Sequence, residues 1–176
     1  MLTSHSIESL LEPYAAQLGD ARTGYLNHCQ RVLALSRLIA PAIVEANELE
    51  FVVASAFHDL GIWVNDTFDY LDPSVELATR WLQQNGHGDR VSLVSEMILQ
   101  HHKVRAADGA NSAVEIFRRA DTVDVTLGLR RFGLSLGSYR ALLKEHPDVG
   151  FHRGLIRLSL RQLRRDPRHP LPMMRW

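Results

Sequence analysis

The sequence has little cysteine, no long apolar run and no excess of charge of either sign. Its 176 residues include one cysteine, Cys29, which cannot form an internal disulfide and indicates a reducing compartment. No run of 18 apolar residues occurs, so we expect no membrane-spanning helix and no membrane partner. Lysine plus arginine and aspartate plus glutamate both number 20, so the overall charge favours neither nucleic acid nor an anionic surface.

Targeting signals and domain boundaries are also missing. The opening stretch MLTSHSIESLLEP lacks a basic segment followed by a long apolar one, so no signal peptide is expected. There are no internal repeats, no low-complexity tracts and no linker. These absences predict a cytoplasmic protein with one domain over residues 1–176.

Helical periodicity dominates the sequence, and the alternation typical of strands is nearly absent. We therefore expect an all-α, single-domain helical bundle of about seven helices. Gly61 follows the apolar stretch of residues 46–60, where a glycine that ends a helix is common. Asp89 is expected to cap the next-but-one helix, residues 104–111 to form a loop, and the proline-rich tail after residue 165 to be loose.

Several titratable residues stand on otherwise apolar helical stripes. His28 shares a helix face with Tyr25, Val32, Leu35 and Ile39. His58 and Asp59 end the most apolar helix of the chain. Asp121 follows Val114 and Phe117 at steps of seven and four residues. A buried carboxylate without a partner is costly, and no lysine or arginine is evident on that face.

A divalent cation would account for these four residues together. Imidazole and carboxylate groups are ligands for zinc, iron, manganese or nickel, and the charge of the metal stabilises buried aspartates. His28, His58, Asp59 and Asp121 come from three separate helices, and helical proteins build metal centres where such helices face one another. Each histidine taken alone is more often a hydrogen-bonded core residue, so the hypothesis depends on the set.

The order His28, then His58-Asp59, then Asp121 resembles the H…HD…D signature of the HD-domain superfamily of metal-dependent phosphohydrolases, which are all-α. The stretches HCQRVLALS and FHDLG resemble the helix of the first histidine and the end of the HD helix, and RRADTVDVTLGLRRFG resembles the last-aspartate helix of small bacterial members. The resemblance covers residues 22–135. It implies metal ligands at these four positions, with Asp59 also catalytic. It also implies that a metal-acidified water attacks phosphorus in a small phosphorylated substrate, such as a nucleotide or phosphomonoester. The metal could be Mn, Mg, Fe, Co, Ni or Zn.

Two more histidines bear on the number of ions. His101 and His102 end the helix that carries Val94 and Ile98, and they resemble the paired histidines of two-metal HD phosphodiesterases. However, Asp72 stands where that subgroup has another histidine, and the glycine-tyrosine-proline sequence of that subgroup is absent. We therefore favour one ion over two, with His101 and His102 as catalytic residues that line the substrate pocket.

Other candidates rest on weaker patterns. Asp66 lies just after the HD pair and could act as a general base, although Asn-Asp in a loop is more often part of a turn. Asp124 follows Asp121 by three residues and could hydrogen-bond a ligand histidine. The cations expected to bind phosphate are Lys103, Arg130 and Arg131, for which a solvated surface role is the default.

The C-terminal segment, residues 150–176, is rich in arginine. It contains one acid, Asp166, and the seven arginines 153, 157, 161, 164, 165, 168 and 175. Five of them follow one side of a helix and could steer a nucleotide or nucleic acid. We favour a solvated face, because the aromatic residues that stack on bases are missing.

Two other functions remain open from the sequence. The first is an HD-type diiron oxygenase, against which the missing histidine near position 72 argues. The second is a non-catalytic protein, in which the metal is structural and the arginine-rich C-terminus binds a partner. The sequence gives no indication of the oligomeric state.

Overall fold

The computed structural model describes residues 5–106 and 112–174 of the chain. Residues 107–111 of the expected loop, and Arg175, therefore lie outside the described residues. Within the described part the protein is all-α and has no strand, which confirms the expected fold class. The helices are α1 (Ile7–Leu11), α2 (Ala15–Leu18), α3 (Arg22–Ile39), α4 (Pro41–Ala46), α5 (Glu48–Phe57), α6 (Gly61–Val64), α7 (Leu71–Gln84), α8 (Val91–Gln100), α9 (Ser112–Val125), α10 (Leu136–Glu145) and α11 (Phe151–Arg165).

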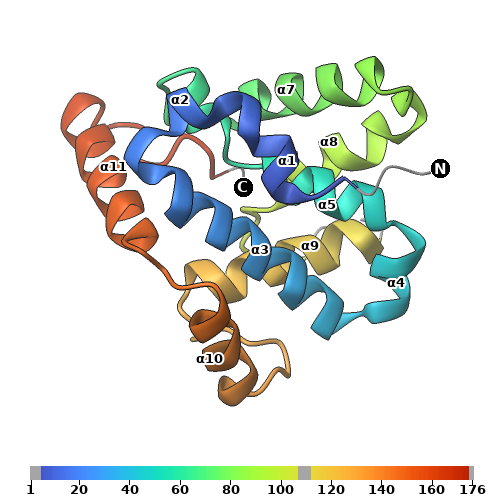
Figure 1. Ribbon diagram of the computed structural model, residues 1–176. Helices are drawn as coiled ribbons and strands as arrows, with labels where there is room; N and C mark the ends of the chain where they lie inside the picture. The colour runs from blue at the N-terminus through green and yellow to red at the C-terminus, as the bar shows by residue number, and fades with distance from the viewer. Residues whose placement is uncertain (1–4, 107–111, 175–176) are drawn as a thin grey trace.

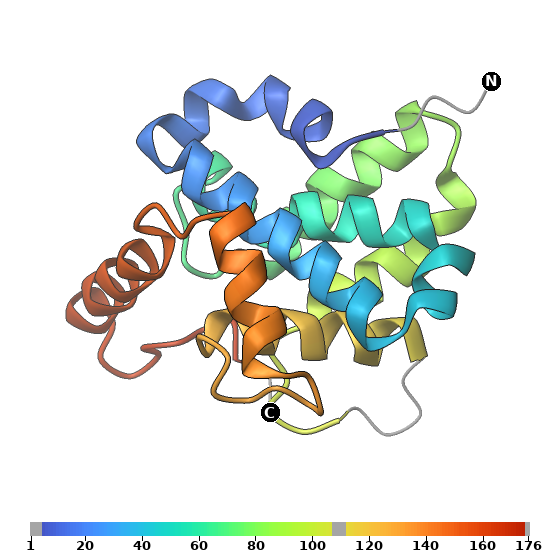
Figure 2. The same cartoon turned by 60° about the horizontal axis from the view of Figure 1, so that its bottom comes forward.

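Helix α3 lies at the centre of the bundle (Figures 1 and 2). It packs along α9 and also contacts α1, α4, α5, α10 and α11. On the other side of α5, helices α7 and α8 pack against α5 and against each other. The buried apolar residues of these helices form the main core, in which Phe51, Phe57 and Phe117 are fully enclosed. Because α3, α5, α8 and α9 meet there, polar residues on their inner faces are brought close together.

The end of α5 differs from the sequence prediction. The helix ends at Phe57, and Gly61 begins α6 instead of ending α5. Gly61 has no positive φ, so it is not a left-handed helix terminator. A side chain at this position would put its Cβ 2.8 Å from the carbonyl oxygen of Tyr70 and 3.0 Å from Ser74 Oγ. The glycine is required by this close approach of the chain that leads into α7.

The helix starts were also only partly predicted. The expected cap at Asp89 is wrong, because a 3-10 turn, Gly88–Arg90, precedes α8 and no side chain caps that helix. Helix α7 begins at Leu71, so Pro73 is its third residue. Proline is tolerated there because its missing N–H would have no partner inside the first turn.

The C-terminal tail is not loose throughout, contrary to expectation. Met173 is only 6% exposed and packs in a small second cluster with Ile62, Phe68, Tyr70 and Leu71. Helix α11 lies at one side of the bundle in both views (Figures 1 and 2), and Phe151 is its one buried residue. No helix of the described residues combines the length and apolar character needed to cross a membrane.

Candidate metal centre

His28 enters the site from the middle of α3 and is held in one orientation. Its Nδ1 lies 2.7 Å from Asp124 Oδ2, which confirms the predicted hydrogen bond between Asp124 and a histidine of the set. Arg31 donates to both oxygens of Asp124, at 2.7 and 2.8 Å, and all three side chains are fully buried. Phe151 stacks on the imidazole, with ring centroids 4.2 Å apart. The Nε2 atom of His28 is therefore directed away from Asp124.

His58 and Asp59 follow the last residue of α5 and face the same space. His58 Nδ1 lies 3.0 Å from the carbonyl oxygen of Ser55. The Tyr25 hydroxyl donates to the carbonyl of Ala56 at 3.0 Å and accepts from the backbone N–H of Asp59 at 3.3 Å. Tyr25 thus fixes the turn that carries the pair to α3.

His101 belongs to the same cluster. It is 1% exposed, its Nδ1 lies 2.6 Å from the carbonyl oxygen of Ile98, and its Nε2 lies 3.3 Å from Asp59 Oδ1. Asp121 approaches from α9, with Oδ1 3.5 Å from His28 Nε2 and 3.7 Å from His58 Nε2. The two Nε2 atoms are 3.0 Å apart. Four separate parts of the chain thus converge on one buried point.

The converging atoms are all hydrogen-bond acceptors when the histidines are neutral. A carbonyl or carboxylate oxygen next to each Nδ1 requires that nitrogen to carry the proton, which leaves a lone pair on Nε2. Three lone pairs and two carboxylates then face one another. With the histidines neutral, Asp59 Oδ1 and His101 Nε2 face each other at 3.3 Å as two acceptors, and Asp121 Oδ1 has no hydrogen-bond partner among the described residues. Such an arrangement requires positive charge among these atoms, either protons or a metal ion, so the residues fit a divalent cation.

The pKa shifts of the clustered side chains also indicate that this site favours a bound positive charge. Burial raises the pKa of Asp121 to about 6, so in the metal-free protein this carboxyl takes up a proton as the pH falls through about 6. Burial lowers the pKa of His58 to about 3 and keeps it neutral, as a metal ligand must be. Burial opposes a charge on His101 as well, yet the nearby Asp59 and Asp121 raise its pKa overall.

Three overlapping groups of side chains are close enough to share an ion. They are His28, His58 and Asp121; His58, Asp59 and His101; and His101, His102 and Asp121. The structure therefore brings together the four expected ligands and also His101. His102 lies at the edge, where its Nε2 is 2.5 Å from the Tyr70 hydroxyl.

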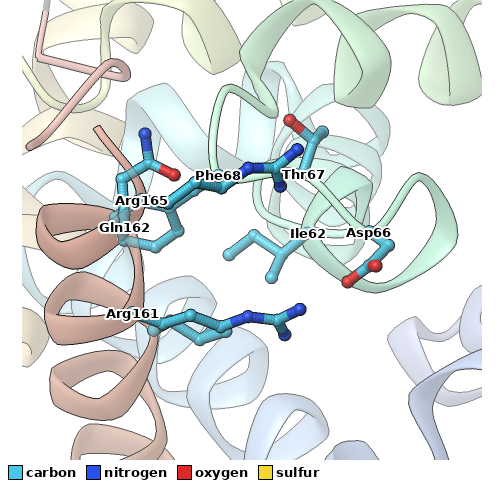
Figure 3. Close-up of a pocket in the computed structure, with 8 residues that line it drawn as sticks. Ile62, Asp66, Thr67, Phe68, Arg161, Gln162 and Arg165 are labelled. Carbon is cyan, nitrogen blue, oxygen red and sulfur yellow. The ribbon is translucent and has the colours of Figure 1, made fainter. Parts of the chain in front are cut away.

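Four other predicted site residues do not line the pocket beside the cluster. Asp66 is exposed and lines a small cavity of about 40 Å³ with Arg161 and Arg165, which extend from α11 toward it (Figure 3). Arg131 donates to the carbonyl of Gly128 at 2.7 Å. Their roles as general base and phosphate ligand stay predictions.

Arg130 and Lys103 also make contacts away from the cluster, Lys103 through its backbone. The Arg130 guanidinium lies 5.4 Å from the centre of the Phe132 ring, and its side chain is exposed. Lys103 is only partly buried, and its carbonyl accepts from Arg118 at 2.9 Å. Neither residue lines the pocket beside the cluster.

Sequence reasoning missed Arg31, Tyr70 and Phe151. Arg31 gave a signal that could have been used, since it lies three residues after His28 on the same helix face and is a cation on an apolar stripe. Tyr70 and Phe151 gave no signal in the sequence. Tyr70 contacts His102 from the segment before α7 and Phe151 contacts His28 from α11, and these contacts depend on how the chain folds back.

The fold and the cluster together define an all-α protein with a buried histidine-aspartate site suited to a divalent metal ion. The HD domain family model matches residues 25–126, and the chain belongs to this family of metal-dependent hydrolases. The matched segment contains all six side chains of the three groups. No curated protein and no solved structure matches the chain.

Proposed function

We propose that the protein is a metal-dependent phosphohydrolase that acts on a small phosphomonoester or nucleotide. The observation that carries the proposal is the buried cluster of acceptors, which needs a cation and adjoins a pocket through Asp59 and His102. Membership of the HD domain family supports the reaction class.

His28, His58, Asp59 and Asp121 would hold the ion. A divalent ion held there would supply Lewis acidity and would make water a nucleophile near neutral pH. The chain contributes the orientation of the ligands. Asp124 and the carbonyl of Ser55 fix the tautomers of His28 and His58, and burial excludes bulk water.

His101 and His102 are proposed to meet the phosphate. His102 lines the adjoining pocket together with Asp59, and its contact with the Tyr70 hydroxyl orients the ring. In this position it can donate a hydrogen bond to a phosphoryl oxygen. One ion is favoured over two, since four ligands suffice for one ion. In addition, Asp72 stands at the position where two-metal members have a further histidine.

The proposal is tested by a phosphatase screen over nucleotides and sugar phosphates with Mn, Mg, Co, Fe, Ni and Zn. Turnover is expected with at least one metal, and it should fall by about a hundredfold or more in Asp59→Ala because a ligand is removed. Asp69→Ala is the matched control, since Asp69 is exposed and lies outside the cluster. Absence of turnover with every metal would contradict the proposal.

Two alternative functions would give different experimental results. A diiron oxygenase would retain two irons per chain and consume oxygen. A non-catalytic binding protein would hydrolyse no phosphoester and would bind a nucleic acid or protein in a salt-dependent manner through the arginines of α11.

A further inference from the structure

An apolar pocket adjoins the candidate metal centre. Its volume is about 430 Å³, which lies in the range of small-molecule sites. Asp59 and His102 form part of its wall, so an occupant can reach the cluster. The apolar side chains that line it are Phe68, Val125, Leu127, Leu155, Ile156, Leu160, Leu171, Met173 and Met174.

The described lining of the pocket is a poor match for a highly charged substrate. Among the described residues that line it there is no lysine or arginine, and its polar groups are Asp59, Tyr70, His102, His152 and Ser159. A di- or triphosphate would therefore lose water and find few partners among these residues beyond the metal itself. Arg161 and Arg165 line a different and much smaller cavity, which neither Asp59 nor His102 lines (Figure 3).

The outer wall of the pocket exposes apolar carbon to water. Leu127, Ile156 and Leu160 are 54%, 61% and 49% exposed, although they lie on or beside a concave surface. Covering these side chains with hydrocarbon would be favourable. Met173 and Met174 add flexible side chains that can adapt to an apolar guest.

We propose that the substrate is the phosphate monoester of an apolar alcohol, with its phosphate at the metal centre and its hydrocarbon in this pocket. The inference rests on the proposed function and narrows it, because it disfavours nucleotides. In the reaction, water adds to phosphorus and the bond between phosphorus and the ester oxygen breaks. The alcohol leaves with one proton, inorganic phosphate is released, and no redox partner is needed.

A substrate series tests the inference. The metal-loaded protein is assayed with ethyl phosphate, octyl phosphate below its micelle concentration, AMP and ATP. Each buried methylene contributes roughly fourfold in binding, so kcat/KM for octyl phosphate should exceed that for ethyl phosphate by at least about tenfold. Hydrolysis of AMP, ATP or ethyl phosphate at an equal or greater kcat/KM would overturn the inference and leave the proposed function standing.

Paired variants on α11 test the pocket itself. Leu160→Gln places a polar group in the lining, whereas Leu163→Gln changes a leucine of similar exposure, 45% against 49%, that does not line the pocket. We expect Leu160→Gln to raise KM for octyl phosphate by about three- to tenfold with little change for ethyl phosphate. Equal effects of the two variants would overturn the inference.

Binding of octylphosphonate, which cannot be hydrolysed at an ester bond, separates this inference from the proposed function. Calorimetry should detect binding to the wild type and weaker binding to Leu160→Gln, even if no ester is turned over. No binding would overturn the inference. A change of molecular mass in solution with Leu160→Gln, measured by light scattering, would also overturn it by assigning this surface to a second copy of the chain.

Discussion

Asp124 influences the candidate metal centre through His28, because its carboxylate contacts Nδ1, on the side of the ring remote from the converging Nε2 atoms. Burial alone would raise the pKa of Asp124, but the hydrogen bonds from His28 and Arg31 hold it well below its usual range. The carboxylate therefore stays charged and keeps the proton on His28 Nδ1. This leaves the lone pair on Nε2 for a metal ion.

Replacement of Asp124 by asparagine should weaken metal binding. The amide has no charge to balance Arg31 and supports the required tautomer of His28 less strongly. We expect the Kd for Mn²⁺ to rise by about 10- to 100-fold, measured by competition with a fluorescent chelator. Asp69→Asn serves as the control, and circular dichroism verifies that the variant is folded. Unchanged affinity in a folded Asp124→Asn variant would contradict this role.

Metal affinity should depend on pH through Asp121. Its pKa is raised to about 6 in the metal-free protein, so below that pH a metal ion must displace a proton. Affinity is expected to rise by about tenfold or more from pH 5 to pH 7 and then to level off. The stability of the metal-free protein should change in the opposite direction. The protonated Asp121 contributes to the free energy of unfolding, and this contribution is lost as the pH rises through about 6. Calorimetric titration at each pH tests the affinity, and a flat profile would be inconsistent with Asp121 as a ligand.

At the scale of elements, the junction of α5 and α6 positions the HD pair. The chain turns immediately after His58 and Asp59, and Gly61 then packs against the segment that enters α7, with its N–H donating to Ser74 Oγ at 3.0 Å. Tyr25 of α3 holds the other side of the turn. The geometry of the metal site therefore depends on close packing of three helices around two residues.

Gly61→Ala should damage both stability and the metal site. The new Cβ would lie 2.8 Å from a backbone oxygen, which cannot move without shifting α7. We expect a loss of about 1–3 kcal/mol in the free energy of unfolding, measured with urea, and weaker metal binding. Gly154→Ala is the control, since space around it is open within a helix, and it should be neutral or stabilising. Equal stability of the two variants would refute the packing argument.

The all-α class and the convergence of His28, Asp59 and Asp121 could be predicted because helical spacing determines which residues share a face. Periodicity does not determine which carbonyl or carboxylate a distant side chain will meet. For that reason the hydrogen bond from Arg131 to the carbonyl of Gly128 was not foreseen, and Met173 was expected in a loose tail but is buried. The role of Gly61 was misassigned because a close approach between segments leaves no local pattern.

At the scale of the whole molecule, the metal centre joins segments that are far apart in the sequence. The proposed ligands come from α3, the α5–α6 junction and α9, with His101 beside them at the end of α8, and these helices also enclose the main core. An ion bound there would link the two sides of the bundle. Its binding free energy would then add to the stability of the folded chain.

Thermal stability should accordingly report metal binding. At a free metal concentration of 100 times Kd, binding adds about 2.7 kcal/mol, which for a chain of this length raises Tm by roughly 5–10 °C. A chelator should reverse the increase, and Asp121→Ala should show little of it. Scanning calorimetry measures the shift, and an equal increase in Asp121→Ala would point to a metal bound elsewhere.

The most direct test of the central claim is the metal content of the protein after equilibrium dialysis, measured by emission spectroscopy. The wild type and the control Asp66→Ala, which changes an exposed residue outside the cluster, should retain about one divalent ion per chain. Asp59→Ala should lose most of it while remaining folded. Full retention of the metal by Asp59→Ala would contradict the account.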